Sequence, residues 1–205
     1  QAKLKLGIDL TGQVAALLTV GWWHNRAEDR TRSLIRDANG APVDSGIISA
    51  AGQTWNLPAS GLAPSSASDT HMLYGIELNG HLDNGWRWTA VASHYDFLRS
   101  LAATARLAEP GIPVNGPGTI ADKAGSGWDT LDLRSSGPLG DRHMLYAGVH
   151  GDRYLLDTRV RNASHWLGDA DGGRLSAFAG RSRTRAAYLQ DVWSFADAWT
   201  LTLGG

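Results

Sequence analysis

Seven histidines have the widest chemical scope in this chain, because imidazole binds metals and moves protons near neutral pH. No two of them have the helical spacing of a zinc enzyme motif, and the chain has no cysteine that would complete a thiolate site. The run His-Met-Leu-Tyr occurs twice, at 71–74 and 143–146, which indicates a repeated strand pattern rather than a metal site. We therefore expect no metal and no cofactor. The histidines are His24, His71, His81, His94, His143, His150 and His165.

Other groups with chemical potential also lack a complete motif. Asp169 and Asp171 have the spacing that begins a calcium loop, but no glutamate closes it at the required distance. The Gly-Ser-Gly of 125–127 lacks the rest of a phosphate-binding loop or a nucleophile elbow. Aspartate, histidine and serine are all present, but without an elbow to arrange them as a triad. We expect that the chain is not an enzyme.

Alternating apolar and polar residues indicate the elements that hold these side chains. In 71–82, HMLYGIELNGHL, one face carries Met72, Tyr74, Ile76 and Leu78, and the other is mostly small, polar or charged. Period two is the pattern of a strand that has different surroundings on its two faces. The same reading predicts strands at about 3–10, 14–25, 70–82, 86–98, 128–135, 142–160, 174–195 and 199–205.

The connections between these strands alternate in length. Short turns are predicted at 11–13, 82–86, 136–141 and 195–198, and long loops at 26–69, 99–126 and 161–173, the first with a hairpin tip at Asn39-Gly40. Long antiparallel strands with short turns at one end and long loops at the other are typical of outer-membrane barrels. The predicted fold is therefore all-β, an antiparallel transmembrane β-barrel segment of about eight strands, with its apolar face toward lipid and its polar face toward a wet lumen.

Composition is compatible with this fold and excludes other classes. Nine tryptophans are many for 205 residues, and Trp86, Trp193, Phe195 and Trp199 lie beside predicted short turns, where a barrel carries an aromatic girdle. The longest apolar run, 14–23, is shorter than the roughly 20 residues of a membrane-spanning helix. A net charge of −1 gives no basic excess, so we expect no nucleic-acid partner.

Arg181, Arg183 and Arg185 interrupt the strand predicted at 174–195. They share a face with Ala179 and Ala187, and three arginines facing lipid at mid-bilayer would cost several kcal/mol. Either this face turns to the lumen here, or the strand extends above the membrane. The length of the strand favours an extension, because about 9–11 residues suffice to cross a bilayer. Anion binding by these arginines stays an open alternative.

Several stretches resemble the barrel of TonB-dependent receptors. In TRAAYLQDVWSFADAWTLTLGG, 184–205, an aromatic-Leu-Gln-Asp run leads to a tryptophan, a tight turn and Leu-Thr-Leu-Gly, which is similar to a recurrent strand–turn–strand of that family. The family usually continues with arginine, whereas Gly205 is the last residue here. LIRDANGAPVDSGII, 34–48, and GSGWDTLDLRSS, 125–136, resemble the siderophore-receptor branch.

The resemblance implies a 22-stranded barrel, closed by an N-terminal plug, in the outer membrane of a Gram-negative bacterium. Residues 1–205 are then expected to be part of the barrel domain, with the plug and the signal peptide absent. The implied activity is capture and energised import of a scarce nutrient, with a ferric siderophore as the expected ligand. The implied partners are the TonB energy-coupling complex, through the absent N-terminal part, and outer-membrane lipid. Candidate ligand contacts are His71, Tyr95, His150, Asp152, Arg181, Arg183 and Arg185.

Two alternatives stay open at this point. A soluble carbohydrate-binding β-sandwich would also use tryptophan, as a platform that stacks on sugars. A sandwich would bury the apolar faces of its two sheets in one core, whereas a barrel exposes its apolar face on the outside all around. A passive porin-like barrel, or a small barrel of eight strands, would share the pattern but would have no plug.

Overall fold

The computed structural model describes residues 1–107 and 115–205, and this part of the chain is built of strands, turns and loops. It contains no helix that could cross a membrane. Eleven strands are described: β1 (Ala2–Thr11), β2 (Val14–Asp29), β3 (Gly46–Ala50), β4 (Gln53–Leu57), β5 (Ser65–His81), β6 (Arg87–Ala105), β7 (Gly118–Asp122), β8 (Gly127–Leu139), β9 (His143–Ala163), β10 (Arg174–Ala196) and β11 (Trp199–Gly204).

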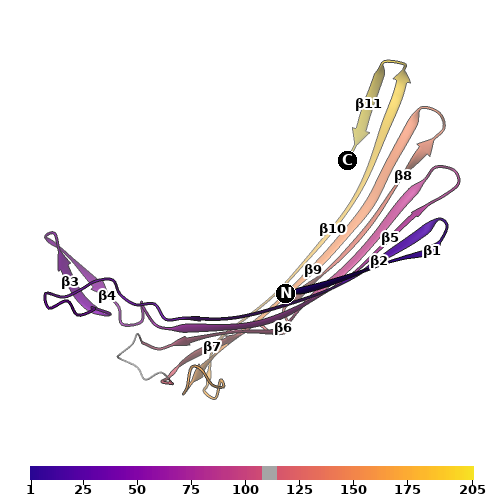
Figure 1. Ribbon diagram of the computed structural model, residues 1–205. Helices are drawn as coiled ribbons and strands as arrows, with labels where there is room; N and C mark the ends of the chain where they lie inside the picture. The colour runs from indigo at the N-terminus through magenta and orange to yellow at the C-terminus, as the bar shows by residue number, and fades with distance from the viewer. Residues whose placement is uncertain (108–114) are drawn as a thin grey trace.

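Nine of these strands form one curved antiparallel sheet (Figure 1). The order is β1-β2-β5-β6, then β7 and β8, each of which pairs with both β6 and β9, and then β9-β10-β11. Strands β3 and β4 form a separate hairpin. The all-β, antiparallel fold class is confirmed, and β1 and β11 form the two edges of the described sheet.

The predicted alternation of short and long connections is confirmed. The turns after β1, β5, β8 and β10 lie together at one end of the sheet, and the β3–β4 hairpin lies toward the other end (Figure 1). The hairpin tip expected at Asn39-Gly40 is also present. The Asp37 carboxylate accepts the N–H groups of Asn39 and Ala41, both at 2.8 Å, and Gly40 has a φ of +81°.

The predicted long loops were wrong in extent. The loop expected at 26–69 contains the end of β2, the β3–β4 hairpin and the start of β5, and the loop expected at 99–126 contains the end of β6 and all of β7. The paired extensions are rich in Ser, Ala and Thr, for example 65–68 and 102–104. Such residues give no apolar face, so the period-two signal fades while the backbone ladder continues. Part of the predicted loop, 108–114, lies outside the described residues.

Strand register sorts the side chains of the sheet onto two unlike faces, because directly paired residues point to the same side. One row joins Leu6, Leu18, Ile76, Ala92 and Leu131 across five strands. The next row, on the opposite face, joins polar or small residues at the equivalent positions: Lys5, Thr19, Gly75, Ser93, Thr130 and Asp152.

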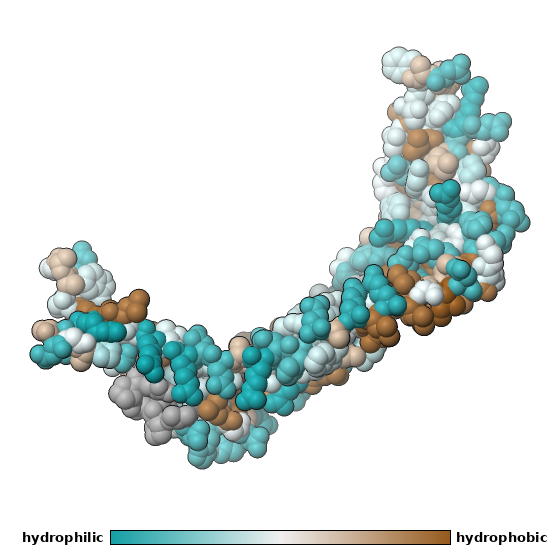
Figure 2. Space-filling model, viewed as in Figure 1, coloured by the Kyte–Doolittle hydropathy of each residue, from teal (hydrophilic) through white to brown (hydrophobic). Residues whose placement is uncertain are grey.

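The apolar residues form a continuous band, here called the apolar belt. In Figure 2 hydrophobic atoms gather along the outer side of the bend, near β1 and β2. The belt consists of Leu4, Leu6, Ile8, Leu10, Ala16, Leu18, Val20, Trp22, Tyr74, Ile76, Leu78, Ala90, Ala92, Leu131, Leu133, Leu145, Ala147, Val149, Ala187, Leu189, Leu201 and Leu203.

The belt crosses the strands diagonally. Toward the long loops, its first polar neighbour on β2 is His24, and on β10 it is Arg185. Arg185, however, lies in the row of Leu18, six residues nearer the short turns than His24. The boundary of the belt therefore moves along the strands by six residues of about 3.4 Å each, over five strand spacings of about 4.8 Å from β2 to β10. This corresponds to a slope of roughly 40° relative to the rows of directly paired residues.

Among the described residues, no second layer covers either face of the sheet. The chain exposes 13641 Å² of surface, whereas a compact monomer of its mass exposes roughly 9,300 Å². The buried hydrophobic residues are few, and the small cluster of Ala105 and Trp166 lies at the long-loop end. The large apolar side chains of the belt are therefore left open, with Leu4 at 69% exposure.

Aromatic rings lie at the short-turn end of the belt face, as expected. The ring of Trp88 covers Gly80 and that of Trp86 covers Gly137, since a Cβ on either glycine would lie 2.4 Å from the ring. Trp193 lies 5.4 Å from Phe195 between ring centroids. The Asp191 carboxylate lies on the same face at this end, and its Oδ2 is 2.7 Å from Nδ1 of His143.

Candidate functional site

Six aromatic side chains from five neighbouring strands meet on the face opposite the apolar belt. We call this group the aromatic ladder. It begins on β2, crosses β5, β6 and β8, and ends on β9. Its members are Trp23, His71, Tyr95, Phe97, Trp128 and Tyr154.

The rings of the ladder stack in pairs. His71 lies on Phe97 with 4.1 Å between ring centroids and 4° between planes, and Tyr95 lies on Trp128 at 4.1 Å and 3°. Phe97 and Trp128 meet edge to face at 6.2 Å, which joins the two stacks. Offset-stacked and edge-to-face contacts are the favourable arrangements for such rings. The ladder is therefore one packed surface.

Polar atoms are built into the ladder. The Nδ1 of His71 and the Tyr95 hydroxyl are 2.9 Å apart. The other ring nitrogen of His71, Nε2, is buried and has no hydrogen-bond partner among the described residues. Beside these groups is a hollow of about 430 Å³ that Lys3, Trp23, His71 and Tyr95 help to line. The ladder thus combines flat rings with a buried, unpartnered ring nitrogen, beside an open space.

Two local features of the backbone position the ladder. The regular β5–β6 register that pairs Leu73 with Tyr95 and His71 with Phe97 ends at His71, where Leu98 is an extra residue. On the other side, the Gly-Ser-Gly turn starts β8. A Cβ on Gly127 would lie 2.2 Å from the Tyr95 carbonyl oxygen, so only glycine permits this approach of β8 to β6.

Ser126 holds the same turn against β9. Its side chain is fully buried, its hydroxyl donates to the Asp157 carbonyl at 3.0 Å, and its oxygen accepts the Asp157 N–H at 2.9 Å. Trp128 follows two residues later, in register with both Tyr95 and Tyr154. The motif at 125–127 therefore has a structural role, which is to place Trp128 between two other aromatic residues.

A group of acidic side chains continues the site toward the short turns. The row beside Tyr95 and Trp128 holds Ser93, Thr130 and Asp152, and the Ser93 and Thr130 hydroxyls are 2.6 Å apart. His150 lies between two carboxylates, with Nδ1 at 2.9 Å from Asp132 and Nε2 at 3.3 Å from Asp152. Among the described residues, His150 therefore contacts two carboxylates.

The structure brings together four of the seven predicted ligand contacts. His71 and Tyr95 are hydrogen-bonded in the ladder, and His150 and Asp152 contact each other next to it. The other three, Arg181, Arg183 and Arg185, lie on the opposite face, because Arg185 pairs with Gly151 in a belt row. The arginines do not turn to the polar face, and so they form no common site with the other four.

Sequence reasoning missed Trp23, Phe97, Trp128 and Tyr154. Each lies on the polar side of its strand, where a reading by apolar face discards it. A search for aromatic residues on the polar face of successive strands would have found Trp23 and Trp128. Alternation alone places Phe97 on the same face as Tyr95, because the register shift lies beyond both residues, at Leu98.

Asp171 closes a loop instead of beginning a calcium site. Its carboxylate accepts the hydroxyl of Ser164 and also the Ser164 N–H, at 2.8 Å. These hydrogen bonds, that from the hydroxyl first, hold the pKa of Asp171 below its ordinary value. No group of three metal-ligating side chains occurs in residues 1–107 and 115–205.

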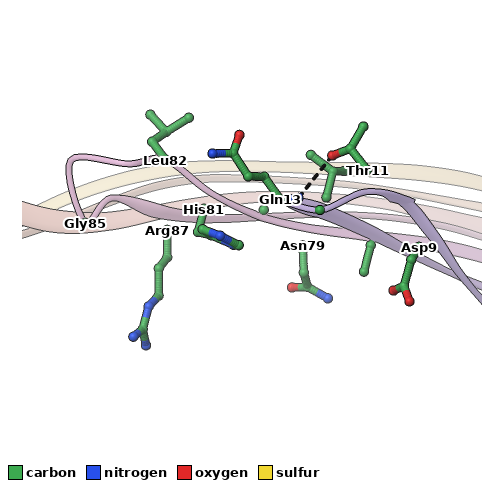
Figure 3. A pocket seen from close by; sticks show the side chains of 12 residues that line it. Asp9, Thr11, Gln13, Asn79, His81, Leu82, Gly85 and Arg87 are labelled. Atoms are coloured by element: carbon green, nitrogen blue, oxygen red, sulfur yellow. Dashed lines mark hydrogen bonds between the residues drawn. The ribbon is translucent and has the colours of Figure 1, made fainter.

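A second hollow lies at the short-turn end. In Figure 3 the side chains of Asp9, Asn79, His81 and Arg87 point to one side and Leu82 to the other. It lies between the turn after β1 and the turn after β5, and its lining has no stacked rings and no close pair of acid and base. The aromatic ladder is therefore the better candidate site.

The ladder and its acidic neighbours form a surface suited to reversible binding. Flat rings stack on conjugated or ring-shaped ligand groups, and carboxylate, hydroxyl and imidazole groups fix their orientation. Comparison with protein-family models and with curated proteins gave no match.

Proposed function

We propose that this chain is an arc of a closed β-barrel in the outer membrane of a Gram-negative bacterium, and that the barrel belongs to a TonB-dependent receptor. The receptor binds and imports a scarce small nutrient, with a ferric siderophore as the expected ligand. Its partners are the surrounding lipid and, through a plug domain, the energy-coupling complex. The aromatic ladder contributes to ligand binding inside the barrel.

The slope of the apolar belt carries the barrel proposal. Strands of outer-membrane barrels tilt by about 35–45° from the membrane normal, so a band level with the membrane must cross them diagonally. The belt slopes by roughly 40° relative to the strand-to-strand rows. A sheet that packs on the core of a soluble protein meets no membrane, so nothing requires its apolar residues to follow a diagonal of this slope.

Other features support the same proposal. The alternating connections place short turns at one end, and rings of Trp86, Trp88 and Trp193 lie at that end of the belt face. A β-sandwich needs a second sheet over the apolar face, and the described residues supply only the small β3–β4 hairpin besides the main sheet. The siderophore receptor assignment depends on the resemblance of the strand–turn–strand at 184–205.

Fractionation followed by uptake tests the proposal. The protein that carries this chain, expressed in a Gram-negative host, is expected in the outer-membrane fraction and to be released only by detergent. Recovery in the soluble fraction without detergent would contradict the barrel. Uptake of a labelled ferric siderophore is expected to depend on an energised inner membrane; uptake that survives an uncoupler would favour a passive barrel.

A variant pair tests the ladder. Trp128→Ala removes the ring between Tyr95 and Tyr154 and is expected to weaken ligand binding by about tenfold. The loss of a stack between two rings costs roughly 0.5–1.5 kcal/mol in addition to the loss of buried apolar area. Trp55→Ala, in the β3–β4 hairpin and away from the ladder, is the control. Equal binding by both variants would remove the ladder from the ligand site.

A further inference from the structure

Four arginines gather on the belt face of β9 and β10, just beyond the belt toward the long loops. We call them the arginine cluster. Arg153 pairs directly with Arg183, and Arg181 and Arg185 lie two residues away on either side of Arg183. Directly paired residues have Cβ atoms about 5 Å apart, and next-but-one residues on a strand lie about 7 Å apart. The four charges therefore share one small patch.

Two carboxylates lie on this face near the patch, Asp129 and Asp157, and each already pairs with an arginine, Arg153 and Arg159 respectively. Arg153 pairs with Asp129 at 2.6 Å, and that carboxylate also contacts His94 at 2.7 Å. Arg181, Arg183 and Arg185 are exposed and make no ion pair with any residue that the structure describes. Like charges directly opposite each other destabilise a strand pair. The arginine side chains of this patch therefore repel one another, and bound anions would reduce this repulsion.

The position of the cluster indicates where such anions come from. Arg185 is the first polar residue beyond the belt on β10, and Arg153 is the first on β9. If the belt lies in the hydrocarbon core, the cluster lies at the level of the lipid headgroups. Its face is the outer one, opposite the aromatic ladder, so a nutrient held by the ladder does not contact it.

We propose that the arginine cluster binds the phosphate groups of anionic phosphorylated lipid headgroups in the leaflet at the long-loop end. Guanidinium groups suit this ligand, because their planar donor fork matches phosphate oxygens two at a time. The inference rests on the proposed function, since the belt places headgroups beside the cluster only within a bilayer. It goes further by assigning a lipid site to residues outside the nutrient path.

The test uses the protein inserted into vesicles of phosphatidylcholine, with and without lipid A, a glycolipid that carries phosphate monoesters. Fluorescent lipid A is expected to bind saturably to the wild type. The triple variant Arg181→Gln, Arg183→Gln, Arg185→Gln is expected to bind it at least about tenfold more weakly, given the usual attraction of each cation to an anionic surface. The matched control is Arg87→Gln with Arg134→Gln, on the opposite face, which should bind like the wild type.

Further arms separate the outcomes. The triple lysine variant keeps the charge but lacks the planar donor fork, so it should bind lipid A more weakly than the wild type and more tightly than the glutamine variant. Complete displacement of lipid A by millimolar inorganic phosphate would assign the site to free phosphate and overturn the proposal. If the wild type and the glutamine variant both insert into the vesicles and bind lipid A equally well, the lipid site is also ruled out. That result would leave the proposed barrel unaffected. Failure of the wild type to insert would overturn the proposed function itself.

Discussion

Leu78 and Glu77 are neighbours in the chain and lie on opposite faces of the sheet. Leu78 pairs with Ala16 and Ala90 within the apolar belt, whereas Glu77 pairs with Leu17 and Val91 on the other face. The Glu77 carboxylate also accepts a hydrogen bond from the Asn79 amide at 2.8 Å. If the belt faces lipid, these two adjacent residues should respond in opposite ways to a change of polarity.

The change Leu78→Arg is expected to destabilise the protein in a bilayer by about 2–4 kcal/mol if the residue lies near the midplane, and by less near an interface. The cost arises because the guanidinium loses its hydration in the hydrocarbon core. Refolding titrations into lipid vesicles measure this free energy.

Glu77→Gln is the matched control for that change. It is expected to have little effect on stability, because the amide still accepts from Asn79 and stays hydrated. A silent Leu78→Arg with an unfolding Glu77→Gln would show that the faces are assigned the wrong way round. If both are silent, this part of β5 lies outside the membrane.

The loop from Ser164 to Gly173 is closed by one carboxylate. Asp171 accepts two hydrogen bonds from Ser164, and the Gly172 N–H donates to the Asn162 carbonyl at 3.0 Å. Because the first two bonds favour the ionised form, the folded-state pKa of Asp171 is lower than the unfolded one. The stabilisation is therefore complete above the ordinary pKa of aspartate and is lost as the pH falls through the lower, folded-state value.

Hydrogen exchange of residues 164–173 tests this pH dependence. At neutral pH, Asp171→Asn is expected to exchange faster than the wild type in this segment, because the amide is a weaker acceptor than the carboxylate. The difference should shrink as the pH falls below the ordinary range of aspartate. A difference that stays constant into acid would show that the carboxylate charge does not hold the loop.

The connections at the two ends of the sheet should differ in access from outside the cell. In the proposed topology the long loops face outward and the short turns face the periplasm. Protease added to whole cells is therefore expected to cleave within 30–64 or 164–173 and to spare 82–86 and 140–142. Cleavage at the short turns in intact cells, with none in the long loops, would invert the topology.

Elements with one apolar face could be predicted well from sequence. The strand predicted at 174–195 matches β10, Arg174–Ala196, because belt residues and turn signals mark its course. β7 and the outer ends of β5 and β6, 65–69 and 99–105, were not predicted, since Ser, Ala and Thr pair there without an apolar side. The site was predicted in part for a related reason. His71 and Tyr95 are visible as single residues, but their stacking on Phe97 and Trp128 depends on which strands are neighbours.

The described sheet as a whole has two open edges and two open faces. The edge strands β1 and β11 each present a row of backbone groups on their outer side, and belt residues are exposed even at the edges, with Leu203 at 58%. Unpaired edges and large exposed apolar surfaces both favour association in water. In the proposed barrel, lipid and neighbouring strands would cover them.

Residues 1–205 expressed alone are therefore not expected to form a stable monomer in water. The surface of 13641 Å², against roughly 9,300 Å² for a compact monomer of this mass, leaves too little buried apolar area to offset the conformational entropy lost on folding. Size-exclusion chromatography should give aggregates in buffer and a dispersed species in detergent. Replacing Leu4, Leu6 and Ile8 with serine should reduce the aggregation. Replacing Lys3, Lys5 and Asp9, on the other face of β1, with serine should not reduce it. A sharp monomeric peak without detergent would mean that these surfaces find partners within the chain itself, and the open sheet would then be the wrong description of the molecule in solution.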